Sequence, residues 1–245
     1  MADIAIIGGT GLNSLKGLTI THREMLKTPY GQASSPLIHG EICGCEIVFL
    51  ARHGSGHTIP PHQVNYRANL WALRDIGVKK VISVAAVGGI RDDMKPGEIV
   101  FPDQIIDYTW SRNNTFFEDH HGVKHIDFTY PYCDELRDSL ITGARDAGLH
   151  SVIDGTYAAT QGPRLESAAE IIKLERDGCH IVGMTAMPEA ALAREMELCY
   201  ATCAVVANWA AGKGDGVITM EIIEENLKSG MDKVRLLLEK ALPCL

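Results

Sequence analysis

Residues 80–87 have the sequence KVISVAAV, an apolar run in which hydrophobic side chains do not alternate with polar ones. A strand that is buried on both faces shows this pattern, because helices cover both sides of its sheet. Gly88 and Gly89 follow directly and end the run. This stretch therefore predicts a strand inside a sheet that is covered by helices.

Apolar runs alternate with helical patterns on both sides of this strand. Further strands are predicted over residues 3–7, 46–50, 98–106, 154–160, 180–184 and 199–207, and helices over residues 65–76, 134–148, 167–177, 188–197 and 219–242. Pro188 is expected in the first turn of its helix. Residues 107–133 are polar and histidine-rich and are predicted to form a long functional loop. The alternation predicts one α/β domain over residues 1–245.

The composition excludes several classes of protein. A chain of 245 residues is long enough for one domain with a buried core. Its net charge of −8 argues against a nucleic-acid-binding surface. No apolar run approaches the roughly 20 residues that a membrane-spanning helix needs, and no signal segment opens the chain. We therefore expect a cytoplasmic protein with neither nucleic-acid nor membrane partners.

The seven cysteines are Cys43, Cys45, Cys133, Cys179, Cys199, Cys203 and Cys244. Their number is odd, and no CxxC pair indicates zinc or redox chemistry. The sequence predicts seven reduced thiols, several of them buried.

A glycine-rich turn, Gly8-Gly9-Thr10-Gly11, follows the first predicted strand. Glycines let the backbone approach an anion, and Thr10 adds a hydroxyl donor. A dinucleotide-binding turn is the rival interpretation, but Ser14 occupies the position of its third glycine. Residues 19–30 offer only Glu24 as the acidic residue, without a convincing strand before it. Alone, the turn is as consistent with a plain tight turn as with a phosphate site.

Arg52 and His53 follow a predicted strand, and a guanidinium can contact phosphate through two N–H groups. A solvated surface arginine is the alternative. Thr185 lies at a strand–helix joint, where free N–H groups favour an anion, although a simple helix cap is equally consistent. Glu166 and Asn208 also follow strands, with helix capping and turn formation as their alternative roles.

The histidines do not match a metal site. His53, His57 and His62 form one group, and His120, His121 and His125 another, but neither has zinc-ligand spacing. Solvated loop histidines are the preferred interpretation for His62, His120 and His121. No metal is expected.

Several stretches together resemble the trimeric purine nucleoside phosphorylase and methylthioadenosine phosphorylase family. They occur in family order and comprise residues 6–12 (IIGGTGL), 50–54 (LARHG), 57–59 (HTI), 64–69 (VNYRAN) and 184–189 (MTAMPE). The resemblance implies a twisted, mixed central β-sheet flanked by helices, and a homotrimer. It implies cleavage of a purine nucleoside by inorganic phosphate as co-substrate, with no metal or organic cofactor.

The resemblance also implies where the substrates bind. Phosphate would contact residues from several loops, namely Thr10, Arg52, His53, the Ala86 backbone and Thr185. Met184 would pack under the ribose. Ala85 departs from the family, which often has asparagine or threonine there, so only backbone contacts are expected at that position.

Two groups of residues are implied to set specificity. Glu166 and Asn208, with Trp209 and Ala210 beside them, would bind the base. Methylthioadenosine phosphorylases have serine at position 166 and aspartates at positions 208 and 210, whereas enzymes that act on inosine and guanosine have glutamate and asparagine at positions 166 and 208, as this chain does. A carboxylate accepts the N1 hydrogen of a 6-oxopurine, and an amide donates to O6 or N7.

At the sugar end, Met220 stands where inosine-cleaving relatives use histidine, with Ile223 one turn on. A thioether suits an apolar 5′-methylthio group. Ordinary helix packing is the alternative for Met220. By resemblance, a neighbouring subunit would supply His125. The combination implies phosphorolysis of S-methyl-5′-thioinosine, with Arg52, His53 and Asn208 as catalytic residues.

Three alternatives remain open. A general inosine and guanosine phosphorylase differs only at the 5′ pocket, and a methylthioadenosine phosphorylase differs only at the base. A nicotinamide-dependent oxidoreductase or a nucleotide-binding module would be supported by residues 8–11 alone.

Overall fold

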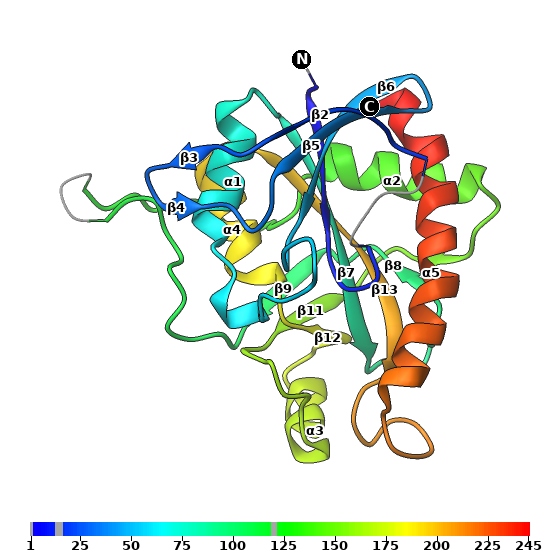
Figure 1. Cartoon of the computed structure of the whole chain (residues 1–245). Helices are drawn as coiled ribbons and strands as arrows, with labels where there is room; N and C mark the ends of the chain where they lie inside the picture. Colours follow the sequence, from blue (N-terminus) through cyan, green and yellow to red (C-terminus); the bar gives the residue numbers. More distant parts are fainter. Residues whose placement is uncertain (1, 13–16, 119–121) are drawn as a thin grey trace.

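The computed structural model of the chain describes residues 2–12, 17–118 and 122–245. Three residues that the sequence singled out, Ser14, His120 and His121, lie outside this described part. Figure 1 shows a central sheet with helices on both sides, and the mixed α/β sheet that the sequence pattern and the resemblance imply is confirmed.

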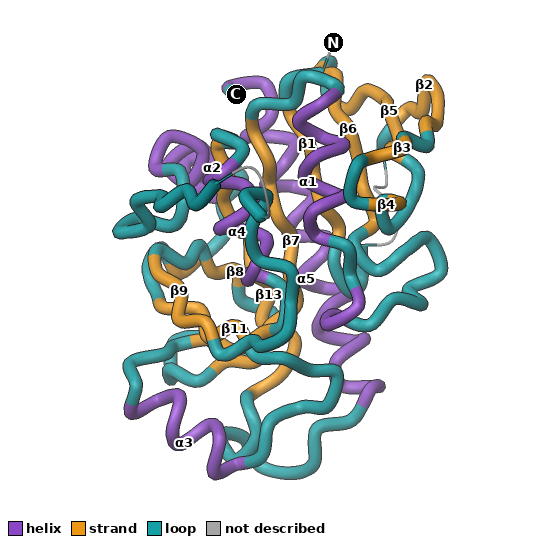
Figure 2. Tube along the Cα trace, turned by 90° about the vertical axis from the view of Figure 1, so that its left-hand side faces the viewer, coloured by secondary structure: helices purple, strands orange, loops and turns teal. Residues whose placement is uncertain are grey.

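The central part of the sheet is parallel. β1 (Ile4–Gly8) lies between β6 (Cys45–Ala51) and β7 (Lys80–Gly89), and β13 (Cys199–Trp209) pairs with the other edge of β7. All four strands run in the same direction, so their carboxyl ends meet at one edge of the sheet (Figure 2). This edge is where a ligand site is expected in an α/β sheet.

Shorter strands extend this sheet. They are β2 (Thr19–Glu24), β5 (Leu37–Ile42), β8 (Ile99–Val100), β9 (Gln104–Asp107), β10 (Ser151–Val152), β11 (Thr156–Ala159) and β12 (Ile181–Gly183); β3 (Lys27–Thr28) and β4 (Gly31–Gln32) form a separate pair. β12 runs antiparallel to the end of β7. The predicted strand over residues 98–106 is divided in two, because Pro102 has no N–H to donate to a ladder.

Helices cover both faces of the sheet, as the KVISVAAV pattern predicted. α1 (Tyr66–Asp75) and α4 (Ala186–Glu195) pack on one face, and α2 (Asp134–Asp146) and α5 (Met220–Ala241) pack on the other. The side chains of Val81 and Ile82 enter opposite cores because successive residues of a strand point to opposite faces. α3 (Ala168–Arg176) lies apart, against β11 and β12.

The first edge of the sheet was not predicted. β2 is antiparallel to β5, which is antiparallel to β6, although no convincing strand was predicted before Glu24. β2 is almost entirely exposed, so its residues, TITHRE, lack the apolar alternation that marks a half-buried strand. Its position at an antiparallel edge also differs from the inner strand that a dinucleotide-binding unit would need.

Two further expectations were wrong in detail. The helix expected from Pro188 begins at Ala186 and is kinked at Met187, whose backbone is extended, before a cis Met187–Pro188 bond.

The prediction of seven thiols also fails, because Cys133 and Cys199 form a disulfide. These cysteines are 66 residues apart in sequence, and only the packing of α2 beside β13 brings them together. The other five are free, and Cys179 and Cys203 are buried as expected.

The predicted loop begins one residue later than expected, because Asp107 ends β9. Residues 108–118 and 122–133, the rest of its described part, contain no helix or strand. Among the described residues, no helix is long and apolar enough to cross a membrane.

Candidate active site

A cavity of about 570 Å³ lies at the carboxyl ends of the parallel strands. Ten of the predicted site residues line it: Thr10, Arg52, His53, Ala86, Glu166, Met184, Thr185, Asn208, Met220 and Ile223. They come from segments that follow β1, β6, β11 and β12, from β7 and β13 themselves and from the start of α5. The strand ends therefore gather residues that are more than 200 positions apart in sequence.

The glycine-rich turn forms one wall of this cavity. The N–H of Leu12 donates to the carbonyl of Gly9, and Gly11 has a positive φ of 84°. Gly9 lies directly on the Arg52 guanidinium, since a Cβ placed on it would be 2.9 Å from Nη1. A side chain at position 9 would thus separate the turn from the arginine beneath it.

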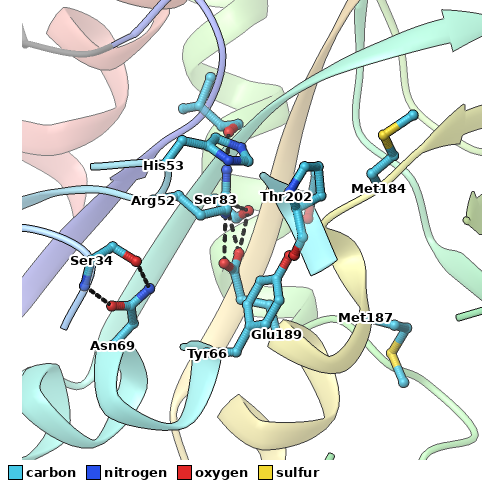
Figure 3. Close-up of polar contacts among 12 residues, drawn as sticks. Ser34, Arg52, His53, Tyr66, Asn69, Ser83, Met184, Met187, Glu189 and Thr202 are labelled. Carbon is cyan, nitrogen blue, oxygen red and sulfur yellow. Dashed lines mark hydrogen bonds and ion pairs between the residues drawn. The ribbon is translucent and has the colours of Figure 1, made fainter. Parts of the chain in front are cut away.

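Arg52 is completely buried, and most of its donors are engaged within the protein. Its Nε and Nη2 donate to the two carboxylate oxygens of Glu189, at 2.7 and 2.8 Å. Nη2 also donates to Ser83, and Nη1 donates to the carbonyl of Val84. Figure 3 shows the guanidinium facing Ser83 and Glu189. A guanidinium has five N–H groups, so one on Nη1, next to Gly9, has no partner in this set.

Glu189 holds this arginine in place. Its carboxylate is buried and accepts two bonds from Arg52 and one each from Ser83 and Tyr200, both at 2.9 Å. Burial alone lowers the pKa of Arg52, but the charge and hydrogen bonds of Glu189 outweigh burial and raise that pKa above its ordinary value. The pair of N–H donors of Arg52 that was expected to contact phosphate, on Nε and Nη2, therefore contacts Glu189 in this structure.

His53 lies beside Arg52 and is 5% exposed. Its Nδ1 is 2.8 Å from the carbonyl oxygen of Ile59, which can only accept, so Nδ1 carries the proton. Burial, followed by the charge of Arg52, lowers the pKa of His53 to about 4. The ring is neutral at neutral pH, and its Nε2 then has a lone pair. His53 is thus a hydrogen-bond acceptor toward the cavity.

Thr185 is at the N-cap position of α4, but its side chain makes no capping bond to the helix. The simple-cap interpretation of Thr185 is therefore wrong for its hydroxyl. The residue is buried and lines the cavity at a helix N-terminus, where the dipole favours an anion.

Asn208 points into the cavity from an irregular part of β13. The pairing of β13 with β7 shifts register between Val206 and Asn208, and such a bulge re-aims a side chain. The Asn208 amide donates to the carbonyl of Trp209 at 2.7 Å, which leaves one of its two N–H groups for a ligand. Asn208 is part of a strand, so the turn interpretation is wrong.

Glu166 is free of helix capping. Ser167 is the N-cap of α3, and its capping box is completed by Glu170, so Glu166 precedes the helix. The Thr160 hydroxyl donates to Glu166 Oε1 at 2.6 Å, and Glu166 lines the cavity. The capping role considered for Glu166 is filled by its neighbours.

The opposite end of the cavity is apolar. Met220 begins α5 and Ile223 follows one turn later, and both line the cavity together with Ile218. Met184, which follows β12, also lines the cavity. Gly162 lies against it, since a Cβ on Gly162 would be 2.4 Å from the Met184 sulfur, and the φ of 61° at this position favours glycine.

The sequence profile of the phosphorylase superfamily matches residues 3–243. The chain belongs to this superfamily. A protein of Pseudomonas syringae pv. tomato named "Probable S-methyl-5'-thioinosine phosphorylase" is 53% identical over 243 residues, covering 99% of both chains. The "6-oxopurine nucleoside phosphorylase" of Pyrococcus furiosus is 47% identical over 245 residues, covering 97% of this chain and 91% of the relative.

Solved structures agree with this assignment. Methylthioadenosine phosphorylase from Schistosoma mansoni, in complex with adenine, has a TM-score of 0.95 at 31% identity and matches 100% of this chain and 91% of its own. The predicted membership of the nucleoside phosphorylase family is confirmed, and the oxidoreductase alternative is not supported. The three names differ in the nucleoside, so they do not by themselves choose the substrate.

Not every predicted residue lines the main cavity of this phosphorylase. Trp209 and Ala210 instead line a smaller neighbouring cavity of about 100 Å³, and Ala210 lies close to Gly88, which lines the main cavity. The predicted contacts of these two residues with the base stay a prediction. His125 is exposed and outside this chain's cavity; its predicted role concerns a neighbouring subunit's site and stays a prediction.

Two residues of the site were missed as functional candidates. Glu189 was quoted only as part of the MTAMPE stretch, although a lone carboxylate in the apolar helix segment AMPEAALA was a usable signal. Arg112 had no local signal at all, because its partners are distant in sequence.

Arg112 fastens the loops that form the cavity walls. Its guanidinium donates to the carbonyls of Thr160 and Gln161, which precede Glu166 in the chain. It also donates to the carbonyls of Met184 and Met187, on either side of Thr185. Its Nε also donates to the Gln161 side chain. The long loop thereby reaches the site, and one of its roles is to fix the walls around it.

Proposed function

We propose that this phosphorylase cleaves S-methyl-5′-thioinosine with inorganic phosphate, releasing hypoxanthine and 5-methylthioribose 1-phosphate. One observation carries the proposal: a single cavity joins the polar pair Glu166 and Asn208 to an apolar end formed by Met220 and Ile223. The close relatives named for this reaction support the proposal, and the chain covers nearly all of their length.

The polar pair favours a 6-oxopurine. A hydrogen on N1 of hypoxanthine can be accepted by the Glu166 carboxylate, whereas adenine has a lone pair at N1 that the carboxylate would repel. The remaining N–H of Asn208 can donate to O6 or N7. A site built on such bonds discriminates strongly, because the wrong base leaves buried polar groups unpaired.

The apolar end favours a methylthio group over a hydroxyl. Neither the Met220 thioether nor the Ile223 side chain offers a strong partner to a 5′-hydroxyl, so burying that hydroxyl would cost free energy. A methylthio group loses nothing there and gains apolar contact.

The chemistry we propose depends on positioning and charge. Phosphate would bind between Thr10, Thr185 and the spare Nη1 hydrogen of Arg52, over the helix dipole of α4. The lone pair on His53 Nε2 would accept a hydrogen bond from the hydroxyl of monohydrogen phosphate, and the proton would stay on the phosphate. As the glycosidic bond stretches, the negative charge of the phosphate stabilises the cationic sugar. A phosphate oxygen then attacks C1′ as the bond to the purine breaks. Asn208 stabilises negative charge on the leaving purine, a contribution typically worth about 10²–10³ in rate.

We further propose that residues 1–245 act as one cytoplasmic domain and assemble as a homotrimer. His125 would then reach the sugar end of a neighbouring subunit's cavity. Inorganic phosphate is the co-substrate, and the mechanism uses no metal or organic cofactor.

One assay tests the substrate directly. Base release from S-methyl-5′-thioinosine, methylthioadenosine and inosine is measured with and without phosphate. We expect phosphate-dependent release, with the highest kcat/KM for S-methyl-5′-thioinosine. Equal values for inosine would favour the broader 6-oxopurine phosphorylase, which the Pyrococcus furiosus relative makes the second candidate. A preference for methylthioadenosine would refute the base assignment.

A further inference from the structure

Two histidines and a glutamate meet on the β2–β5 edge of the sheet. His22 of β2 pairs directly with His39 of β5, and Glu24 follows His22 by two residues. Because side chains on a strand alternate between faces, His22 and Glu24 project to the same side, and so does the cross-strand partner His39. The strands in Figures 1 and 2 that carry these residues lie at the margin of the sheet, away from α3 and the catalytic cavity.

The potential ligand atoms of these three residues are close together. One nitrogen from each histidine and one carboxylate oxygen lie within 4.8 Å of one another. The two imidazole rings are stacked, with centroids 4.0 Å apart and planes inclined by 12°. Because the lone pairs of an imidazole lie in its ring plane, the two rings would turn out of their stacked arrangement to bring the three atoms around one ion, whose ligand bonds are about 2.0–2.2 Å.

One of these atoms lacks a hydrogen bond. Nε2 of His39 is buried and makes no hydrogen bond, and Oε2 of Glu24 lies 3.4 Å from it at ion-pair distance. An unbonded buried polar atom is costly, and a metal–nitrogen bond would satisfy it. Nδ1 of His22 lies 3.3 Å from the Thr21 hydroxyl, a contact that can hold the proton on Nδ1 and leave Nε2 for a metal.

The surroundings of this cluster are acidic. A cavity of about 540 Å³ beside it is lined by Glu24, Glu41, Glu46 and Asp75, and none of the described residues lining it is lysine or arginine. Carboxylates along one cavity concentrate cations there. Ala2 and Glu46, which also line it, precede or begin β1 and β6, so this cavity lies at the amino ends of strands whose carboxyl ends carry the catalytic site.

We propose that His22, Glu24 and His39 bind a zinc ion. Two imidazoles and one carboxylate suit Zn²⁺ better than Mg²⁺ or Ca²⁺, which prefer oxygen ligands. A fourth position is left for water or a carboxylate from the cavity. The ion would cross-link β2, which is almost entirely exposed, to β5, which is anchored in the core, and so stabilise the outer strand of the sheet. The proposed zinc site lies at the other end of the strands from the catalytic cavity, so we expect it to take no part in phosphorolysis.

The test is zinc binding by the full chain after removal of metals with a chelator. Calorimetric titration should show one zinc site per chain in the unmodified protein. His22→Ala and His39→Ala should each weaken it at least about tenfold, and Glu24→Gln, which keeps the side-chain shape, should also weaken it. Circular dichroism of each variant establishes that it is folded.

Two matched controls exclude other ligands. His150→Ala removes an exposed histidine elsewhere, and the double variant Cys43→Ser with Cys45→Ser removes one exposed and one partly exposed thiol near this edge; both should retain the site. Cobalt provides a second readout, because thiolate ligands give a strong ultraviolet charge-transfer band and this site should not. Zinc should raise Tm, and the chelator should leave phosphorolysis unchanged.

The outcomes are decisive. No zinc binding by the unmodified protein, undiminished binding by both histidine variants, or loss only in the cysteine variant would overturn the proposal. Because phosphorolysis is measured separately, failure of the zinc site leaves the proposed reaction untouched.

Discussion

The two ends of the catalytic cavity are built in different ways. At the phosphate end, Arg52, His53 and Thr185 are 0, 5 and 7% exposed, and hydrogen bonds to Glu189 and Ile59 fix the first two. At the sugar end, Met220 is 58% exposed and lies in the first turn of α5. One end is rigid and shielded from water, and the other is open.

This difference separates chemistry from specificity. The buried end can stabilise charge strongly, because water does not screen it and little reorganisation is needed. Substitutions there should therefore damage both folding and catalysis. Met220 at the open end is mostly exposed, so this residue can be exchanged to suit another nucleoside while the fold and the chemistry are retained, whereas Ile223 is buried in the core beneath it.

The largest effect is expected from Glu189→Ala. Removing the Glu189 carboxylate leaves the Arg52 guanidinium buried without a counter-charge. This should lower the free energy of unfolding by about 3–5 kcal/mol. The KM for phosphate should also rise, since Arg52 is no longer held beneath Gly9. Denaturant unfolding and phosphate-dependent kinetics measure both effects.

Glu195→Ala is the matched control for this change. Glu195 is a buried carboxylate of the same helix that accepts bonds from Thr115 and Phe116. It should lose stability while its KM for phosphate stays near that of the unmodified protein. A loss below about 1 kcal/mol for Glu189→Ala would show that the phosphate end is not organised by this ion pair.

The next effect concerns the base. Asn208→Asp combined with Glu166→Ser should raise the kcat/KM of methylthioadenosine relative to S-methyl-5′-thioinosine by at least about 100-fold. The physical reason is that the carboxylate no longer opposes the adenine N1, and an aspartate repels O6. Glu170→Ser, which removes a carboxylate of the α3 capping box, is the control and should leave the ratio unchanged. An unaltered ratio in the double variant would remove Glu166 and Asn208 from the base pocket.

A smaller effect is expected from Met220→His. The imidazole can bond a 5′-hydroxyl, so the preference for S-methyl-5′-thioinosine over inosine should fall by about tenfold, with stability nearly unchanged. Ile222→His is the control, because Ile222 is exposed on the same helix but does not line the main cavity. If both variants behave alike, Met220 does not contact the 5′ group.

The smallest change in the rate of phosphorolysis is expected from the titration of His53, because this ring stays neutral over the usual pH range of the assay. Its pKa of about 4 means that lowering the pH from 8 to 6 does not charge this ring in the free enzyme. The unfolded chain protonates near pH 6.5, so the stability contributed by neutral His53 is lost as the pH falls from about 6.5 toward 4. An NMR titration, assigned with a His53→Gln variant, should give a midpoint near 4 that rises when phosphate is bound. A midpoint near 6.5 without phosphate would contradict the buried, neutral imidazole.

The sequence predicted most of the fold because the core strands carry strong local signals. KVISVAAV and the apolar run ending at Arg52 are buried on both faces, so their composition alone identifies them. β2 was missed because an exposed edge strand needs no apolar residues. The Cys133–Cys199 pair was missed because nothing local joins residues 66 positions apart.

The sequence by itself determined which residues stand at the strand ends, and these ends converge because parallel strands finish at one edge of a sheet. Only the tertiary structure decided what each residue does there. Glu189 occupies the charged face of Arg52, Ile59 sets the proton on His53, and Ser167 with Glu170 releases Glu166 from capping. Such roles depend on partners far along the chain, on burial and on distances of a few tenths of an ångström, which no local pattern of residues contains.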